Sequence, residues 1–225
     1  MKNFILSMIA FAVLFTSCVK EDVTPMGECG FTDFKYYQGE QDFLGEMSNH
    51  YILLGVDTAH NDNQIHEFIS TVKDLDRNYS YTVHTFPRYK FKEIPLRLQS
   101  FKTCGQIGYI IAELEQNEIV SYVHYTMKTD NCLNLIWEPI GNLCINSYGS
   151  NFYVKVFDEN DLNDLNRIIE ETNTELVGPN DFMPKVFELR ATKGSQGDAL
   201  KMANYFHETG LFEFTEPGIS KYAVE

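Results

Sequence analysis

Apolar residues recur with two different periods along the last third of the chain, and each change of period predicts a new element. Residues 151–157 alternate apolar and polar side chains, which predicts a strand, whereas residues 159–173 place apolar side chains three and four apart, which predicts a helix. The stretches TELVGPN and PKVFELRAT predict two more strands, residues 198–210 predict a second helix ended by Gly210, and LFEFTEP predicts a closing strand. The order is βαββαβ. We therefore expect an α+β protein in which residues 150–219 form a ferredoxin-like domain, with two helices covering one face of an antiparallel sheet.

Residues 31–130 show a less regular version of the same alternation. KYYQGEQ predicts a hairpin, His50–Val56 predicts a buried strand, and apolar residues at helical spacing follow over residues 61–76. Further strands are predicted over residues 79–86, 107–114 and 117–128, and the Pro-containing stretch between the first two of these is expected to be irregular. Because only one helix is predicted, we expect a degenerate α+β domain with a mainly antiparallel sheet. A hairpin over residues 131–149 is expected to connect the two halves.

The first eighteen residues have the pattern of an export signal. Lys2 precedes an apolar run of about a dozen residues, which is shorter than the roughly 20 residues of a membrane-spanning helix. The small residues directly before Cys18 resemble the lipobox of bacterial lipoproteins, in which the cysteine is acylated and becomes the first residue after cleavage. This resemblance implies a signal peptide over residues 1–17, a tether over residues 18–30 and a protein that is lipid-anchored at the outer membrane or cell surface. The alternative is an ordinary signal peptide that ends near a cysteine.

Charge narrows the range of partners. The 18 basic residues less Lys2 leave 17 against 32 acidic residues after removal of the signal, a formal net charge of about −15. Such an acidic protein is a poor partner for nucleic acid or for an anionic lipid surface. We expect contact with the membrane through the lipid anchor only.

The remaining cysteines indicate disulfides rather than a metal site. Four are left once Cys18 is set aside, and an exported chain allows three full pairings that the sequence does not rank. No Cys-x-x-Cys spacing occurs, so we expect no zinc and no cofactor. The disulfide candidates are Cys29, Cys104, Cys132 and Cys144.

The sequence contains no catalytic constellation, and we expect a protein that is not an enzyme. Asp57 follows an apolar run, but no His-Gly-Thr stretch and no nucleophile segment accompany it, and a triad needs all three partners. A strand ending in an aspartate turn explains Asp57 better. Of the six histidines, His50, His84 and His124 lie on predicted strands with no carboxylate or cysteine at ligand spacing, which favours structural roles.

Residues 150–219, from NFYVKVFDEN to the closing LKMANYFHETGLFEFTEP, resemble the pro-region of subtilisin-like serine proteases, in particular the long two-part pro-regions of Bacteroidetes members. The most specific part is a helix of the Leu-x-x-Ala-Asn type that ends in glycine and is followed by a strand ending in Glu-Pro. The resemblance is weaker along residues 50–128. It implies a protein that binds a subtilisin-like protease through its sheet face and a C-terminal tail, and that inhibits the protease or assists its folding.

The tail after the last predicted strand, residues 220–225, is SKYAVE. By the resemblance it would lie in the protease cleft as an added strand, with Tyr222, Ala223, Val224 and Glu225 in successive subsites. Two alternatives stay open: a non-catalytic surface interaction or adhesion module, and a truncated relic of a protease precursor. An inhibitor of this kind needs a free tail, whereas an adhesion module tolerates a tail packed onto its own body.

The acylation of Cys18 is directly testable. We expect Cys18→Ala to move the protein from the membrane fraction to the soluble fraction, because the acyl chains would be its only membrane contact. Fractionation followed by immunoblotting measures this. A Cys18→Ala protein that stays with the membrane would show that acylation at Cys18 is wrong.

Overall fold

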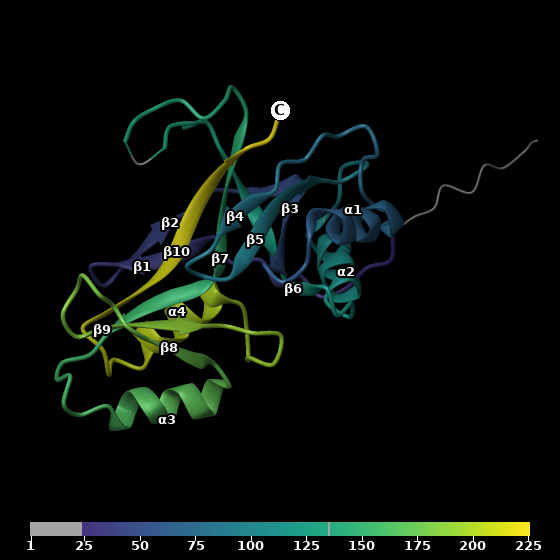
Figure 1. Ribbon diagram of the computed structural model, residues 1–225. Helices are drawn as coiled ribbons and strands as arrows, with labels where there is room; N and C mark the ends of the chain where they lie inside the picture. Colours follow the sequence, from purple (N-terminus) through teal and green to yellow (C-terminus); the bar gives the residue numbers. More distant parts are fainter. Residues whose placement is uncertain (1–23, 135) are drawn as a thin grey trace, which may run out of the picture.

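The computed structural model describes residues 24–134 and 136–225 and shows an α+β protein (Figure 1). The signal segment and Cys18 lie outside the described residues. Eight strands form one antiparallel sheet, and a separate two-stranded hairpin lies beside it. The predicted fold class is confirmed.

The second half has the predicted ferredoxin-like topology. Its strands lie in the order β10-β7-β9-β8, and every neighbouring pair is antiparallel. Asp198 caps the second helix by accepting a hydrogen bond from the Lys201 N–H, and Gly210 follows that helix with a φ of 69°, as expected of a glycine that ends a helix. The elements are β7 (Cys144–Lys155), α3 (Asn163–Thr172), β8 (Glu175–Pro179), β9 (Val186–Arg190), α4 (Ala199–Glu208) and β10 (Phe214–Ala223).

The first half repeats this topology in full. Its strand order is β6-β3-β5-β4, again antiparallel throughout, so the expectation of a degenerate domain with one helix is wrong. The elements are β3 (Met47–Asp57), α1 (Asp62–Thr71), β4 (His84–Phe86), β5 (Phe91–Arg97), α2 (Cys104–Leu114) and β6 (Val120–Thr129).

The error in the first half concerns α2, where a strand was predicted over residues 107–114. Thr103 and Gln106 form a capping box, in which each side chain bonds the other residue's backbone N–H. Ile107, Ile110 and Leu114 then lie on one buried face. The Thr-x-x-Gln spacing is a helix-start signal that the apolar run after it obscured.

The second correction in this half concerns β5, which lies inside the stretch expected to be irregular. Residues 91–97 pair with β3 along their whole length, and Pro95 lies opposite Leu53. Pro95 interrupts the sequence pattern of a strand but not the strand itself. The adjoining strand β4 is also shorter than the predicted 79–86.

Of the three segments predicted outside the two βαββαβ units, the first hairpin is present, whereas the tether and the connecting hairpin differ from the prediction. The predicted hairpin is present as β1 (Phe34–Tyr37) and β2 (Glu40–Phe43). Residues 24–30, predicted to be tether, contact the body although residues 25–29 are exposed: Thr24 is buried, and the Gly27 N–H donates to the Gly105 carbonyl at 2.8 Å. The predicted connecting hairpin is a loop with a single bridge between Leu133 and Pro139.

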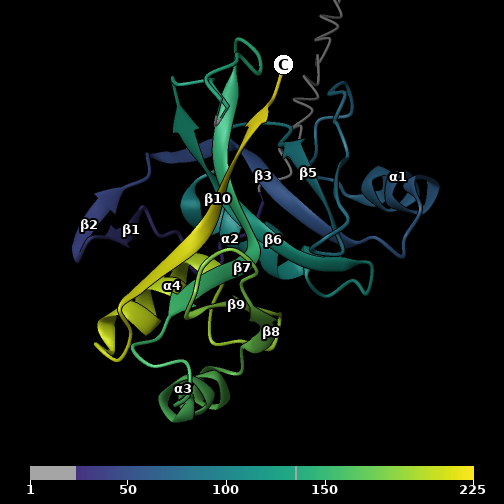
Figure 2. The ribbon, with the colours of Figure 1, turned by 60° about the vertical axis from the view of Figure 1, so that its left-hand side comes forward.

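One strand joins both halves into one sheet. On one edge β7 pairs with β6 through Cys144–Asn146 and with β9 through Asn151–Lys155, while its other edge pairs with β10 along nearly its whole length. Figure 2 shows β10 running alongside β7. The sheet therefore forks at residues 147–150 of β7, where β6 diverges and β9 has not yet begun.

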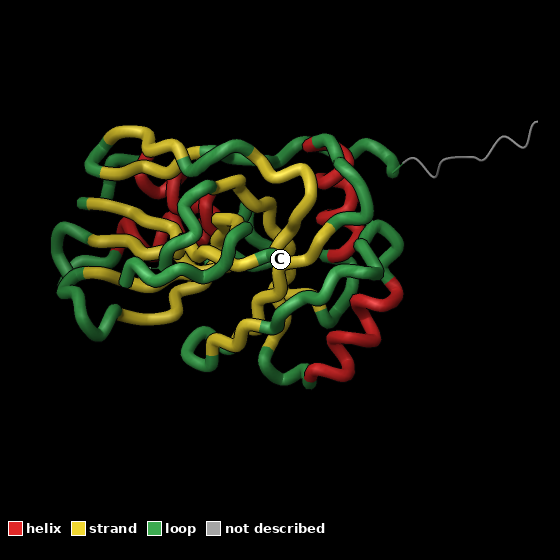
Figure 3. The backbone as a smooth tube through the Cα atoms, turned by 90° about the horizontal axis from the view of Figure 1, so that it is seen from above, coloured by secondary structure: helices red, strands yellow, loops and turns green. Residues whose placement is uncertain are grey.

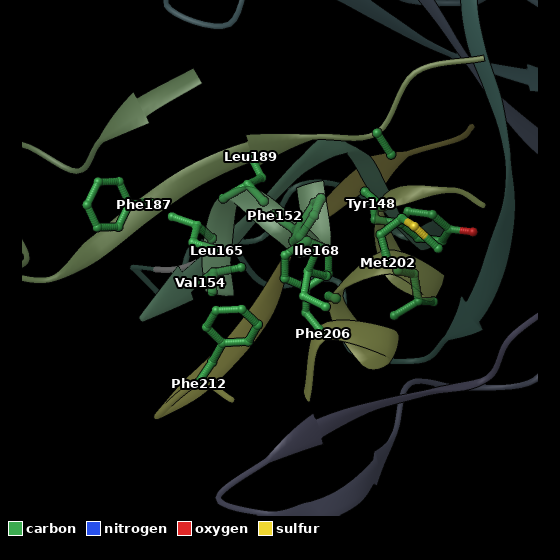
Figure 4. Close-up of a cluster of buried hydrophobic side chains, with 14 of the residues drawn as sticks. Tyr148, Phe152, Val154, Leu165, Ile168, Phe187, Leu189, Met202, Phe206 and Phe212 are labelled. Carbon is green, nitrogen blue, oxygen red and sulfur yellow. The ribbon is translucent and has the colours of Figure 1, made fainter. Parts of the chain in front are cut away.

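All four helices lie on one face of this sheet. Tyr125 and Met127 point to the same side of β6, because side chains alternate along a strand. Tyr125 belongs to the core under α1 and α2, and Met127 belongs to the core under α3 and α4, which Figure 4 shows in close-up. Figure 3 shows the helices grouped toward the two ends of the molecule.

Two disulfides resolve the pairing that the sequence left open. Cys29–Cys104 ties the segment before β1 to the start of α2, and Cys132–Cys144 ties the connecting loop to the start of β7. The first spans 75 residues, so it constrains the unfolded chain more strongly than the second, which spans 12.

Candidate functional site

The residues predicted to form a free tail are instead packed into the body. Ser220–Ala223 belong to β10, and Tyr222 and Val224 are only 3% and 1% exposed. The Tyr51 hydroxyl donates to the Val224 carbonyl at 3.1 Å, and Glu225 accepts from the Asn142 side chain and the Leu143 N–H. The prediction of a free, protease-contacting tail is therefore wrong, because alternate residues of the segment complete a buried core instead of facing solvent.

A buried carboxylate holds this end of β10 in place. Glu93 on β5 accepts hydrogen bonds from the Tyr122 hydroxyl at 2.5 Å and from the Tyr222 hydroxyl, and all three side chains are buried. Burial, together with the nearby Glu93 charge, raises the pKa of both tyrosines well above the usual value. Gly149 is needed here, since a Cβ at that position would lie 2.6 Å from the Glu93 carboxylate.

This contact shows how strongly the sheet is curled. Four strand spacings separate β10 from β5 in the sheet order, which is about 19 Å in a flat sheet. The Tyr222 hydroxyl nevertheless reaches Glu93. The face opposite the helices is therefore concave, and its interior is filled by a third core that includes Tyr51, Leu53 and Ile145.

The curl brings the two edge strands β10 and β4 toward each other and leaves a groove of about 690 Å³ between them. Among the described residues, β10 pairs with β7 alone and β4 pairs with β5 alone. Each strand therefore keeps one unpaired edge. Phe86, Trp137, Pro217 and Ile219 supply apolar lining.

One wall of the groove is the loop that follows β6. The disulfide between Cys132 and Cys144 fixes the base of this loop, and the Asn134 side chain accepts hydrogen bonds from the Ile136 and Glu138 N–H groups. The turn presents Trp137 with 77% of its surface exposed. An exposed tryptophan on a braced turn beside a groove is typical of a recognition surface.

His84 on β4 contacts Tyr222 on β10. Its ring packs against Tyr222 with centroids 4.9 Å apart, and its Nε2 is buried without a hydrogen-bond partner among the described residues. Burial lowers the pKa of His84, and the Glu93 carboxylate offsets part of that effect.

The other predicted site residues fall in different places. Cys18 lies outside the described residues, and all four disulfide candidates are paired. Within residues 24–134 and 136–225, no group of three or more His, Cys, Asp or Glu side chains is placed to hold a metal ion. The sequence interpretation missed both Glu93 and Trp137. Glu93 lies in the Pro-containing stretch that was expected to be irregular, and Trp137 lies in the predicted connecting hairpin, for which no binding role was expected.

Comparison with known proteins identifies no family. No protein-family model and no curated protein matches the chain. Among solved structures, the acetolactate synthase small subunit from Thermotoga maritima is similar over 76% of this chain and 94% of that chain, at 13% sequence identity and a TM-score of 0.26. A TM-score this low carries no argument about function.

The packing of β10 against the body can be tested by removing the Tyr222 hydroxyl. Tyr222→Phe removes the donor to the Glu93 carboxylate, so we expect the free energy of unfolding to fall by about 1.5–3 kcal/mol. Tyr205→Phe is the matched control, because Tyr205 is 39% exposed and its hydroxyl has no hydrogen bond among the described residues; there we expect a change within about 0.5 kcal/mol. Urea denaturation measures both. Equal stability of the two variants would show that the tail is not held in solution.

Proposed function

We propose that the protein is a non-catalytic binding module that holds an extended segment of a partner polypeptide in the groove between β10 and β4. The observation that carries this proposal is the pair of unpaired strand edges facing one groove beside the exposed Trp137. An unpaired edge offers backbone N–H and C=O groups to a further strand. Binding by strand addition uses those groups for affinity and nearby pockets for alternate side chains.

The charges at the groove favour an uncharged partner segment. Lys35 forms an ion pair with Glu216, and the Lys221 ammonium donates to the Leu133 carbonyl at 3.1 Å. Both cations are therefore already engaged within the protein. The remaining lining is aromatic, aliphatic, amide or, at Ser220, hydroxyl, which suits a segment whose apolar side chains alternate.

Selection from a display library of random ten-residue peptides tests this function on purified residues 19–225. We expect enriched peptides with alternating apolar residues that bind at micromolar Kd by isothermal titration calorimetry. Trp137→Ala should weaken them at least tenfold, and methylation of alternate peptide amides should abolish binding, because a strand pairs through every second residue.

The control variant for that experiment is Phe182→Ala. Phe182 is 80% exposed but does not line the groove. We expect it to bind the selected peptides as the wild type does. Equal weakening by Trp137→Ala and Phe182→Ala, or full binding by the methylated peptides, would contradict strand addition in the groove.

A second candidate function is binding of a subtilisin-like protease. The resemblance of residues 150–219 to subtilase pro-regions supports it, and the βαββαβ order of β7 to β10 agrees with that resemblance. Because residues 220–225 are packed onto the body, such a protease would have to bind a surface other than the tail. The edge strand β8 and the loop after it carry the exposed apolar side chains Leu176, Val177, Phe182 and Met183.

Inhibition assays separate this candidate from the first. If the protein binds such proteases through the β8 edge, residues 19–225 should inhibit at least one member of a subtilisin-like panel at micromolar concentration. The double variant Phe182→Ala/Met183→Ala should then lose inhibition, while Trp137→Ala should keep it. Absence of inhibition across a panel that includes proteases of the source organism would exclude the protease function. It would not count against peptide binding in the groove.

We also propose that acylation at Cys18 holds the protein at the outer membrane or cell surface. No helix in the described part of the chain has the length and apolar character needed to cross a membrane. Thr24 is already buried against the body. The stretch from Cys18 to Thr24 spans at most about 20 Å when fully extended, which would keep the folded body close to the lipid.

A further inference from the structure

A second recess lies at the fork in the sheet, away from the groove. It is a cavity of about 450 Å³ between the C-terminal half of α2, the diverging strand β6 and the loop of residues 191–198. Both halves of the protein therefore contribute to it. Its volume lies within the range of small-molecule sites, about 300–1,000 Å³.

Charged groups of both signs line this cavity without pairing to one another. Glu28, Glu115 and Asp198 supply carboxylates, and Lys193 and Lys201 supply ammonium groups. Among the described residues, none of these five takes part in an ion pair within 4.0 Å, although the Lys193 ammonium donates one hydrogen bond to the Asn117 carbonyl at 2.9 Å. Charged side chains that form no ion pair within the protein can form ion pairs with a charged ligand.

The existing contacts of Asp198 and Glu115 give these two carboxylates different roles. Asp198 is occupied, because it accepts from the Lys201 N–H at 2.9 Å as the cap of α4 and from the Tyr148 hydroxyl at 3.0 Å. Among the described residues, Glu115 accepts one hydrogen bond, from the Val123 N–H at 3.3 Å. Burial raises the pKa of Glu115, and the Val123 hydrogen bond and the nearby Lys193 charge offset part of that effect.

His124 adds an acceptor beside Glu115. Its ring is 4% exposed and is stacked between Tyr122 and Tyr148. Nδ1 lies 2.7 Å from the Tyr148 carbonyl, which can only accept, so Nδ1 carries the proton and Nε2 keeps its lone pair in the neutral ring. No hydrogen bond among the described residues reaches Nε2.

We propose that this cavity binds a small zwitterion, a free amino acid or a molecule with the same two charged groups. The ligand ammonium would donate to the Glu115 carboxylate and to Nε2 of His124, and the ligand carboxylate would face the ammonium groups of Lys193 and Lys201. A simple anion would meet Glu115 and Asp198, and a simple cation would meet the two lysines. Only a ligand with both charges complements both sides.

Thermal-shift measurements and isothermal titration calorimetry test the proposal on residues 19–225, which include every described residue. The probes are the twenty common amino acids, each at 10 mM. We expect at least one to raise Tm and to bind with one-to-one stoichiometry. The N-acetyl and the amide forms of that amino acid should each bind at least tenfold more weakly, because each loses one of the two charges.

Variants locate the site. Glu115→Gln keeps the acceptor for the Val123 N–H but removes the charge, and Lys201→Met removes one cation; each should weaken binding at least tenfold. Glu113→Gln is the control, because Glu113 is exposed on the same helix and does not line the cavity. No binding by any of the twenty, equal binding of the blocked forms, or undiminished binding by both Glu115→Gln and Lys201→Met would overturn the proposal.

Discussion

Strand β7 has to pair with three neighbours, and the rest of the architecture follows from that constraint. Its first residues bond β6, its last residues bond β9, and its opposite edge bonds β10. Two βαββαβ units thereby become one sheet with all helices on one face. The fork in β7 is the cost of this arrangement, because one strand edge cannot bond two diverging neighbours at the same residues.

A buried carboxylate connects distant strands of the curled sheet. A carboxylate in an apolar interior is destabilising unless hydrogen bonds satisfy it, and Glu93 receives them from Tyr122 and Tyr222. Those two tyrosines lie on β6 and β10, so the hydrogen bonds also hold the last strand over the concave face. Without that closure the edges of β10 and β4 would not face each other across a groove.

The two recesses differ in chemistry because they border different parts of the sheet. The groove lies between strand edges whose backbone groups are unpaired and whose nearby charges are engaged. The cavity lies at the fork, where helix ends and a loop bring side-chain charges together without pairing them. Tyr122 connects the two regions, since it lines the cavity and also donates to the carboxylate that holds Tyr222.

Local pattern predicted the second half well, because clear periodicity and the end signal Gly210 agree there. It failed at α2, where consecutive apolar residues fit either period, and at β5, where Pro95 interrupts an otherwise regular strand. Residues 220–225 were expected to form a free tail because the resemblance to subtilase pro-regions implies one. Nothing local indicates that Tyr222 has a partner at all.

The sequence by itself determined the periods, the caps and the order of most elements, since these depend on neighbours a few residues apart. Only the tertiary structure decided that Tyr222 is held by Glu93, 129 residues away, and that Cys29 pairs with Cys104. Only the tertiary structure decided, too, that charges from α2 and from the loop before α4 share one cavity. The physical reason is that burial, disulfide pairing and electrostatic contact depend on distance in space, and the chain brings distant segments together only when the shared sheet has formed.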